Sequence, residues 1–401
     1  MRLSGYLSLA DFESAARRRL PRAVYGFVSG GSEQEQSLQE NRAAFARLGF
    51  LPRGLRGADR RDPGRTLWGR AYQAPFGIAP MGIAGMCRQG ADLDLARAAH
   101  AAGLPFILSG SSNVPLEDIL PQAPGTWYQG YFPGDTARLE RILQRLRAAR
   151  VEVLVVTIDT CVAGNRENNA RRGFTVPFAL SPALMADGLA HPRWLLDVFA
   201  RTLATTGVPR WCNLYEEIGC RITEEPAHGF RTGRDLLGWE HIAWLRERWP
   251  GPLVVKGVMH PDDARQAVRH RLDGVIVSNH GGRQLDGALA PLQVLPEIVA
   301  AVPQGFPVMV DGGFRRGSDV LKAVALGARM VFVGRPFMYA TAVGGQPALA
   351  HAIGLLRAEI ERDMALLGCA SLDELTGAFL RAIAGAAAAS PSPVFASEEL
   401  P

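Results

Sequence analysis

Short apolar runs recur eight times between residues 76 and 335, and each ends in or just before a polar residue or a glycine. The runs are rich in β-branched and other apolar residues, which is typical of strands buried on both faces of a parallel sheet. Stretches with helical periodicity separate most of them. Eight strands alternating with helices favour an α/β fold of the (β/α)8, or TIM-barrel, type. The predicted strands are Phe76–Gly82, Pro105–Gly110, Trp127–Tyr131, Val151–Asp159, Pro252–Gly257, Asp273–Gly282, Pro307–Gly313 and Arg329–Arg335.

A doubly wound sheet is the alternative to a barrel. Such a sheet usually has fewer strands and carries a GxGxxG motif at its first turn, and the first predicted strand here is not followed by that motif. The clearest predicted helices between the strands are 91–103, 135–150, 260–271 and 315–328.

The spacing of the strands departs once from a regular barrel. The connection after the fourth strand is far longer than one crossover helix requires, which predicts an insertion at about 176–237 on the active-site face. We expect an N-terminal helical extension over 1–70 with a helix at Leu9–Ser29, a barrel over 71–375 and a C-terminal tail over 376–401.

Charge and cysteine usage exclude several classes of protein. The net charge is +5, and no long basic run is interleaved with aromatic residues, so nucleic acid is not an expected partner. Five cysteines without a CxxC pair favour reduced thiols in the cytoplasm over a disulfide framework or a metal site. The N-terminal residues have no apolar core of signal-peptide length, and no run of 18 uncharged apolar residues predicts a membrane span.

The most distinctive segment is SNHGGRQLDG, Ser278–Gly287, which directly follows the sixth predicted strand. Reactive residues of such barrels sit at the carboxyl ends of strands, so His280 is the candidate base. Arg283, three residues on, could grip a carboxylate through two parallel hydrogen bonds. Asp159, which ends the fourth strand, is the candidate carboxylate to orient His280 and to raise its basicity.

Glycine and arginine residues follow the last two strands, in DGGFRRGSD (311–319) and VGRP (333–336). Barrels commonly bind phosphate in these two loops. Glycines there permit close approach by backbone N–H groups, and Arg315 and Arg335 add fork-shaped donors.

Lys256 ends the fifth strand and is one of only two lysines among 44 basic residues, the other being Lys322. An ammonium at the barrel mouth could form a Schiff base, contact a phosphate, or stabilise charge on an electron-rich cofactor. Where arginine is so strongly preferred, a retained lysine suggests a specific need for an ammonium.

These segments together resemble the FMN-dependent α-hydroxy-acid oxidase/dehydrogenase family. The resemblance runs from about Ala10 to Leu372 and is closest to the (S)-mandelate dehydrogenase branch. It implies FMN as cofactor, no metal, and oxidation of an (S)-2-hydroxy acid to the 2-oxo acid. The segments that carry it are Leu20–Phe45, PFGIAPMG, IDTCVAGNRE, VVKG, SNHGGRQLDG, VDGGFRRGSDVLKAVALGA and VGRPFMYA.

The resemblance also implies roles for individual residues. His280 would be the base, paired with Asp159, while Lys256 would stabilise negative charge near flavin N1. The substrate carboxylate would be held by Arg166 and Arg283, with Tyr131 near the substrate oxygen. The residues implied around the ring system are Pro80, Gly82, Ser109, Gln129, Thr157 and Ser278. Those implied around the ribityl chain and phosphate are Asp311, Gly313, Arg315, Gly334 and Arg335.

One departure from the family pattern concerns the substrate. Where relatives usually have VYDY, the chain has Val24–Tyr25–Gly26–Phe27, so Phe27 replaces a tyrosine that would donate to the substrate carboxylate. We expect an aromatic or apolar, mandelate-like substrate. A lactate- or glycolate-type oxidase, and a divergent enzyme that tailors a natural product or peptide, remain as alternatives.

The electron acceptor and the assembly are the remaining expectations. Oxidases of the family tend to carry alanine where this chain has Gly82, so the resemblance implies a dehydrogenase that reacts poorly with oxygen, and we expect oxygen or a quinone as the acceptor. The insertion 176–237 could touch the inner face of a membrane as a peripheral contact or close over the barrel as a lid. The resemblance implies a homotetramer.

Overall fold

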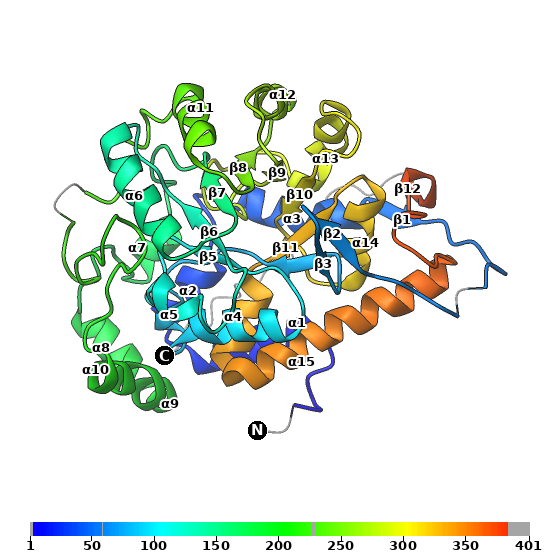
Figure 1. The fold of residues 1–401 in the computed structure, drawn as a ribbon. Coiled ribbons are helices and arrows are strands. Elements are labelled where there is room, and N and C mark those ends of the chain that lie inside the picture. The colour runs from blue at the N-terminus through cyan, green and yellow to red at the C-terminus, as the bar shows by residue number, and fades with distance from the viewer. Residues whose placement is uncertain (1–2, 58, 227–228, 384–401) are drawn as a thin grey trace.

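Eight parallel strands form the centre of the protein in a computed structural model that describes residues 3–57, 59–226 and 229–383 (Figure 1). The strands pair in the order β4-β11-β10-β9-β8-β7-β6-β5. The two ends of this sheet meet where Ile78 bridges Phe106, so the sheet curls into a nearly closed barrel and the prediction of a (β/α)8 fold is confirmed. The strands are β4 (Phe76–Ile78), β5 (Ile107–Ser109), β6 (Trp127–Gly130), β7 (Leu154–Thr157), β8 (Leu253–Val258), β9 (Gly274–Val277), β10 (Val308–Asp311) and β11 (Met330–Val333).

The continuous apolar runs reflect burial on both faces of the barrel wall. In β7 the side chain of Val155 points into the barrel, where it packs in a cluster with Trp127 and Phe332. Its neighbours Leu154 and Val156 belong to the outer core beneath the helices. Because successive side chains alternate between the two faces, a strand buried on both sides has no position for a polar residue until it ends.

Helices follow the strands around the outside of the barrel. The four predicted helices are present as α4, α6, α12 and α14. Asp135 caps α6 by accepting hydrogen bonds from the backbone N–H groups of Ala137 and Arg138. The helices around the barrel are α4 (Ala91–Ala101), α5 (Leu116–Ile119), α6 (Thr136–Ala148), α11 (Trp239–Arg248), α12 (Pro261–Arg269), α13 (Pro291–Ala300), α14 (Gly317–Ala325) and α15 (Arg335–Leu367), the last kinked at Gly344–Gly345.

The N-terminal helix predicted over Leu9–Ser29 is wrong in one respect, because it is two helices, α1 (Leu9–Arg19) and α2 (Arg22–Ser29). Leu20 and Pro21 between them are extended, and a proline disfavours helical geometry in the residue before it. α3 (Gln36–Ala46) follows and leads into β1 (Leu48–Phe50). The remaining elements are the hairpin β2 (Arg65–Leu67) and β3 (Arg70–Tyr72), and 3-10 turns at Ala84–Met86 and Gly377–Phe379.

The end of the described chain pairs with its beginning. β12 (Leu380–Ala382) is antiparallel to β1, so the first residues of the predicted tail are tied to the N-terminal extension. Residues 384–401 of that predicted tail lie outside the described residues.

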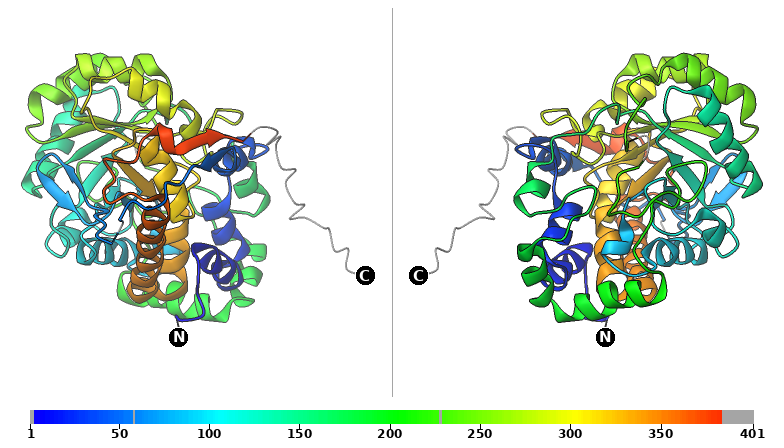
Figure 2. Two further views of the ribbon diagram at one scale, coloured as in Figure 1. Left: turned by 90° about the vertical axis from the view of Figure 1, so that its right-hand side faces the viewer. Right: turned by 90° about the vertical axis from the view of Figure 1, so that its left-hand side faces the viewer.

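The long connection between β7 and β8 contains several short helices, and part of it docks on the N-terminal helices (Figure 2). Trp194 donates to the carbonyl of Met86 at 2.8 Å, and Asp197 pairs with Arg19 at 2.8 Å. Its elements are α7 (Glu167–Arg171), α8 (Pro182–Leu189), α9 (Pro192–Trp194), a π-helical turn (Leu195–Ala200) and α10 (Arg201–Thr205). Among the helices of the described ranges, none has the length and apolarity needed to cross a membrane.

Candidate active site

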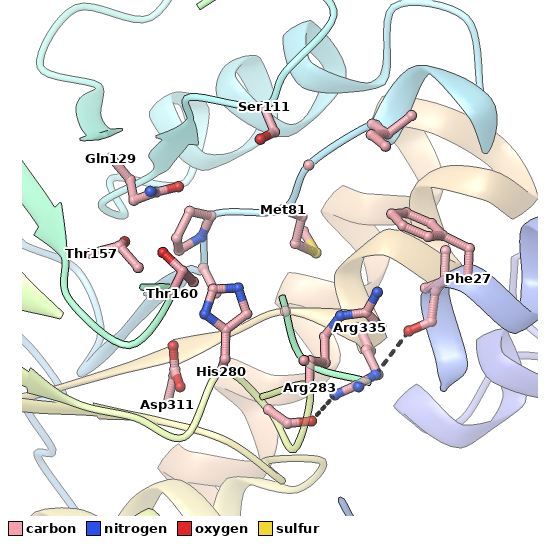
Figure 3. Close-up of a pocket in the computed structure, with 18 of the residues that line it drawn as sticks. Phe27, Met81, Ser111, Gln129, Thr157, Thr160, His280, Arg283, Asp311 and Arg335 are labelled. Atoms are coloured by element: carbon pink, nitrogen blue, oxygen red, sulfur yellow. Dashed lines mark hydrogen bonds between the residues drawn. The ribbon is translucent and has the colours of Figure 1, made fainter. Parts of the chain in front are cut away.

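A cavity of about 430 Å³ opens at the carboxyl ends of the strands and is closed by α2 and the insertion (Figure 3). This volume lies in the range of small-molecule sites. The predicted residues that line it are Phe27, Pro80, Gly82, Gln129, Tyr131, Thr157, Arg166, Lys256, His280, Arg283, Asp311, Gly313, Arg315, Gly334 and Arg335. Ser109, Asp159 and Ser278 do not line it, but each is hydrogen-bonded to a residue that does.

His280 is held in the cavity by the turn that follows β9. Its backbone φ is +58°, an unusual value for a residue with a side chain, and its backbone N–H donates to Ser278 Oγ at 3.0 Å. The side chains of Asn279 and Asn41 hydrogen-bond each other in both directions, at 2.7 and 2.8 Å, which anchors the turn to α3. The strained turn therefore gives the imidazole a fixed position.

The predicted pair of His280 and Asp159 is present, with 2.9 Å between His280 Nδ1 and Asp159 Oδ1. Burial lowers the pKa of His280 below 6.5, and the opposing effect of Asp159 does not outweigh it. Asp159 acts in the expected direction and raises the pKa of His280, but burial and the nearby cations Lys256 and Arg166 outweigh it and favour the neutral ring. Burial also opposes ionisation of Asp159, but His280 and Lys256 bring its pKa below the usual value. A neutral imidazole beside a carboxylate is ready to accept a proton near neutral pH.

Lys256 forms a closed polar group with Ser278 and Asp311 beneath the cavity. Its Nζ lies 2.8 Å from Asp311 Oδ2 and donates to Ser278 Oγ at 2.8 Å, and Ser278 donates to the other oxygen of Asp311. Burial opposes the ammonium, yet Asp311 and Asp159 raise the pKa of Lys256 above its ordinary value. The side chain stays charged, so it is not the free amine that a Schiff base requires.

Arg166 and Arg283 bring two guanidinium groups to the same cavity. Burial lowers the pKa of Arg166 to about 10 and that of Arg283 well below its ordinary value. Arg283 donates to the carbonyl of Gly30 at 2.7 Å and lies 5.2 Å from the centre of the Phe27 ring. Phe27 in turn stacks on Phe174 with 4.4 Å between ring centres. Where relatives are expected to have a tyrosine hydroxyl, this protein has the ring of Phe27, which packs against Arg283 on one side and Phe174 on another.

In the two loops expected to bind phosphate, two residues also have structural contacts with the rest of the protein. Arg335 donates to the backbone carbonyls of Val28, Gly30 and Gly281 at 2.9, 2.9 and 3.0 Å, so it also ties the N-terminal segment to the barrel. Three of its five N–H groups are used in this way, and two remain for a ligand. The glycine at 313 has φ +86°, and a Cβ there would meet the carbonyl oxygen of Asn41 at 2.0 Å. Packing alone therefore demands Gly313.

Arg315 faces the cavity from the loop after β10. Its Nη1 donates to the carbonyl of Phe314 at 3.0 Å, and burial lowers its pKa to about 10. Its Nε is buried and has no hydrogen-bond partner among the described residues, although Glu13 Oε2 lies 3.9 Å away as an ion-pair partner. An anionic ligand would satisfy such a donor.

Two further orphaned polar atoms test whether the cavity fits FMN. Gln129 Nε2 and Thr157 Oγ1 are buried without hydrogen-bond partners in the described part of the chain. Ser109 donates to Gln129 Oε1 at 3.1 Å, which leaves the amide N–H groups of Gln129 free for a ligand. Buried polar groups are normally satisfied, so these atoms call for hydrogen-bond partners from a ligand, and the carbonyl and N–H groups at the edge of a flavin ring can supply them. The residues present therefore fit the cofactor.

Several residues that line the cavity are not predicted from the sequence. Arg231 and Arg234 enter the cavity from the insertion, and Arg234 lies 4.4 Å above the centre of the Tyr131 ring. Trp211 and Phe230 add aromatic walls from the same segment, and Phe174 adds another from just before it. The only signal for them is the RTGR spacing inside an otherwise irregular connection, and their direction depends on how that connection folds back.

Comparison with known proteins gives a consistent match over almost the whole chain. Residues 16–382 match the profile of the FMN-dependent dehydrogenase family. The chain is 37% identical over 375 residues to an (S)-mandelate dehydrogenase of Pseudomonas putida, covering 93% of each protein. It is 35% identical over 377 residues to an L-lactate dehydrogenase of Alcaligenes faecalis, covering 93% of this chain and 98% of that protein. A crystal structure of the monotopic membrane protein (S)-mandelate dehydrogenase superposes with a TM-score of 0.85 at 35% identity, over 94% of this chain and 99% of that one.

Proposed function

The chain belongs to the FMN-dependent dehydrogenase family and is an FMN-dependent 2-hydroxy-acid oxidoreductase, and on that premise we propose that it oxidises an aromatic or apolar (S)-2-hydroxy acid to the 2-oxo acid. The observation that carries this proposal is the His280–Asp159 pair, which faces the same cavity as Arg166 and Arg283. A base next to two carboxylate-binding groups suits an acid whose reacting carbon bears the hydroxyl.

In the proposed reaction, separate residues bind the substrate and accept its proton. Arg166 and Arg283 bind the substrate carboxylate, and Tyr131 contacts the substrate oxygen. His280 takes a proton on Nε2, since its Nδ1 is engaged by Asp159, and Asp159 stabilises the imidazolium that forms. FMN, when bound, accepts the two electrons that leave the substrate.

We propose that FMN is held by the residues assigned to it from the resemblance. Gln129 and Thr157 would satisfy their orphaned atoms on the ring system, and Arg315 and Arg335 would offer their free donors to the phosphate. Lys256, already charged, would stabilise negative charge on the ring. The other proposed contacts are Pro80, Gly82, Asp311, Gly313 and Gly334, while Ser109 and Ser278, which do not line the cavity, would support the cofactor through Gln129 and Lys256.

The walls of the cavity favour an aromatic or apolar side chain on the substrate. Aromatic and aliphatic residues lie around the opening, and Phe27 removes a polar group expected in relatives. A lactate-type substrate, and a larger natural-product substrate, are the alternatives that the same walls leave. The apolar lining includes Phe27, Phe174, Val176, Trp211, Leu214 and Phe230.

Anaerobic flavin reduction tests the proposal. The purified protein, loaded with FMN, should lose its flavin absorbance when (S)-mandelate is added and should respond more weakly to lactate. His280→Asn should retain FMN but lose reduction by substrate. A protein that binds no FMN, or a His280→Asn variant that is reduced at the normal rate, would contradict the proposal. Reoxidation by oxygen against a soluble quinone then identifies the acceptor.

We also propose that the insertion makes a peripheral membrane contact. Leu180, Leu189 and Leu196 are 62%, 68% and 67% exposed, and the arginines 193 and 201 lie close to them in sequence. A surface that combines exposed leucines with arginines can rest in the interface of an anionic bilayer. The double change Leu189→Ser/Leu196→Ser should abolish co-sedimentation with anionic vesicles, whereas Leu366→Ser, on the equally exposed surface of α15, should not. The implied tetramer stays a prediction, which the molar mass in solution tests.

A further inference from the structure

The cavity holds more positive charge than its own carboxylates can balance. Among the described residues, Asp311 is the acidic side chain that lines it, and it is paired with Lys256, while Asp159 lies behind the lining and is hydrogen-bonded to His280. Five arginines of the lining form no ion pair with a carboxylate in the described part of the chain: Arg335, which is assigned to the FMN phosphate, and numbers 166, 231, 234 and 283. Unpaired cations in a partly desolvated site are costly, which indicates that ligands supply the missing negative charge.

Arg231 and Arg234 are positioned by a turn that closes over the end of β6. The backbone N–H of Arg234 donates to the carbonyl of Arg231 at 3.1 Å, and Gly134 donates to the carbonyl of Gly233 at 2.7 Å. A Cβ on Gly134 would meet the carbonyl oxygen of Leu236 at 2.5 Å, so the two segments are in close contact. The turn therefore directs both arginines into the cavity.

The donors of these two arginines are mostly unused. Arg231 donates from Nη1 to the carbonyl of Val162 at 3.0 Å, and the guanidinium of Arg234 has the face of Tyr131 as its partner within the described residues. Burial lowers the pKa of Arg234 to about 10, and Arg231 acts in the same direction. Both guanidinium groups therefore present free N–H groups where a substrate would lie.

A simple 2-hydroxy acid cannot balance this set, because it carries one carboxylate, and Arg166 and Arg283 already bind that group in the proposed function. We propose that the physiological substrate carries a second acidic group, at the end remote from the hydroxy acid, which Arg231 and Arg234 bind. This inference rests on the proposed function and narrows its substrate class to aromatic or extended 2-hydroxy acids with a distal acid. The rings of Trp211 and Phe230 line the same cavity and would pack against the part of the substrate between its two acidic ends.

Three mandelates that differ only at the para position test this inference on the FMN-loaded enzyme. They are mandelate, its neutral 4-carboxamide and 4-carboxymandelate, and their 2-oxo products serve as ligands that do not turn over. Perturbation of the flavin spectrum gives the Kd of each product. A pair of charge-assisted hydrogen bonds should make the 4-carboxy compound bind roughly 10- to 100-fold tighter than the carboxamide.

Arginine variants locate the effect. Arg234→Gln and Arg231→Gln should abolish the preference for the 4-carboxy compound while leaving the Kd of the unsubstituted product within about twofold, and Arg234→Lys should retain part of it. Arg201→Gln, which removes an exposed arginine of the same insertion, should leave the preference intact. Equal affinity for the acid and the carboxamide in the unchanged enzyme would overturn the inference, as would a preference that survives both glutamine variants. Flavin reduction by none of the three mandelates would instead contradict the proposed function.

Discussion

Replacing Asp159 by asparagine isolates the charge beside the base. Asp159 Oδ1 accepts from His280, whereas Oδ2 is buried and has no hydrogen-bond partner among the described residues. An asparagine can therefore place its NH2 group at the Oδ2 position and keep the contact with Nδ1. The substitution removes the negative charge and preserves the shape, so we expect slower substrate oxidation with little change in substrate affinity.

The size of the effect follows from the charge that forms on His280. Two opposite charges about 4 Å apart at an effective dielectric constant of about 20 attract by about 4 kcal/mol, which is an upper limit. The excess of a charge-assisted hydrogen bond over a neutral one sets a lower limit of about 1.5 kcal/mol. The rate constant for flavin reduction should therefore fall roughly 10- to 1,000-fold.

Stopped-flow flavin reduction across the pH range measures both the rate and the pKa of the base. In the unchanged enzyme, reduction should decline only as the pH falls below about 6.5, because burial lowers the pKa of His280 and the ring must be neutral to accept a proton. Asp159 raises that pKa, so its replacement should move the decline to still lower pH while the plateau drops. In a His280→Asn background the same change should have almost no effect, because the two residues act as one unit. A fall of less than threefold, or a decline that moves to higher pH, would refute the reasoning.

Three other changes test separate features of the site. Lys256→Met leaves the Asp311 carboxylate buried without its cation, so the free energy of unfolding in urea should fall by about 3–5 kcal/mol. Adding Asp311→Asn should restore part of this stability. An unchanged free energy of unfolding would mean that the pair is not formed. Phe27→Tyr should tighten binding of simple 2-hydroxy acids by about tenfold, measured as Kd, and an unchanged Kd would show that Phe27 is not near the substrate carboxylate. Gly313→Ala should prevent stable folding, because its Cβ would clash with Asn41, whereas Gly287→Ala, at φ +80° with open space around it, should cost only about 1–3 kcal/mol by thermal unfolding.

Much of the site could be predicted from strand ends because of the way a barrel is buried. Strands covered on both faces must be apolar throughout, so the first polar residue after each run marks the barrel mouth. Gln129, Thr157, Lys256, His280 and Asp311 were found in this way, and all of them line the cavity. Lys322, the other lysine, has a structural contact instead, since its Nζ donates to the carbonyl of Phe45 at 2.8 Å.

Residues outside the regular strands could not be placed by pattern. Arg231 and Arg234 lie in a connection without periodicity, where no rule of spacing says which way a side chain points. Pro21 is a local signal for the break between α1 and α2, but the helical periodicity on both sides of it favours the prediction of one continuous helix.

The barrel and the polar residues at its mouth can be predicted from the amino-acid sequence alone, because they depend on local periodicity, and the cofactor follows from the resemblance of short motifs to a known family. How those groups affect one another depends on the tertiary fold. His280 and Asp159 are 121 positions apart and meet because β7 and β9 both flank β8. Burial then sets the pKa of His280 below its ordinary value, against the effect of its partner, since the cost of desolvating a charge depends on everything packed around it. The same dependence on folded surroundings leaves Arg231 and Arg234 without an ion-paired carboxylate among the residues that the structure describes, and the proposed second acidic group of the substrate rests on this observation.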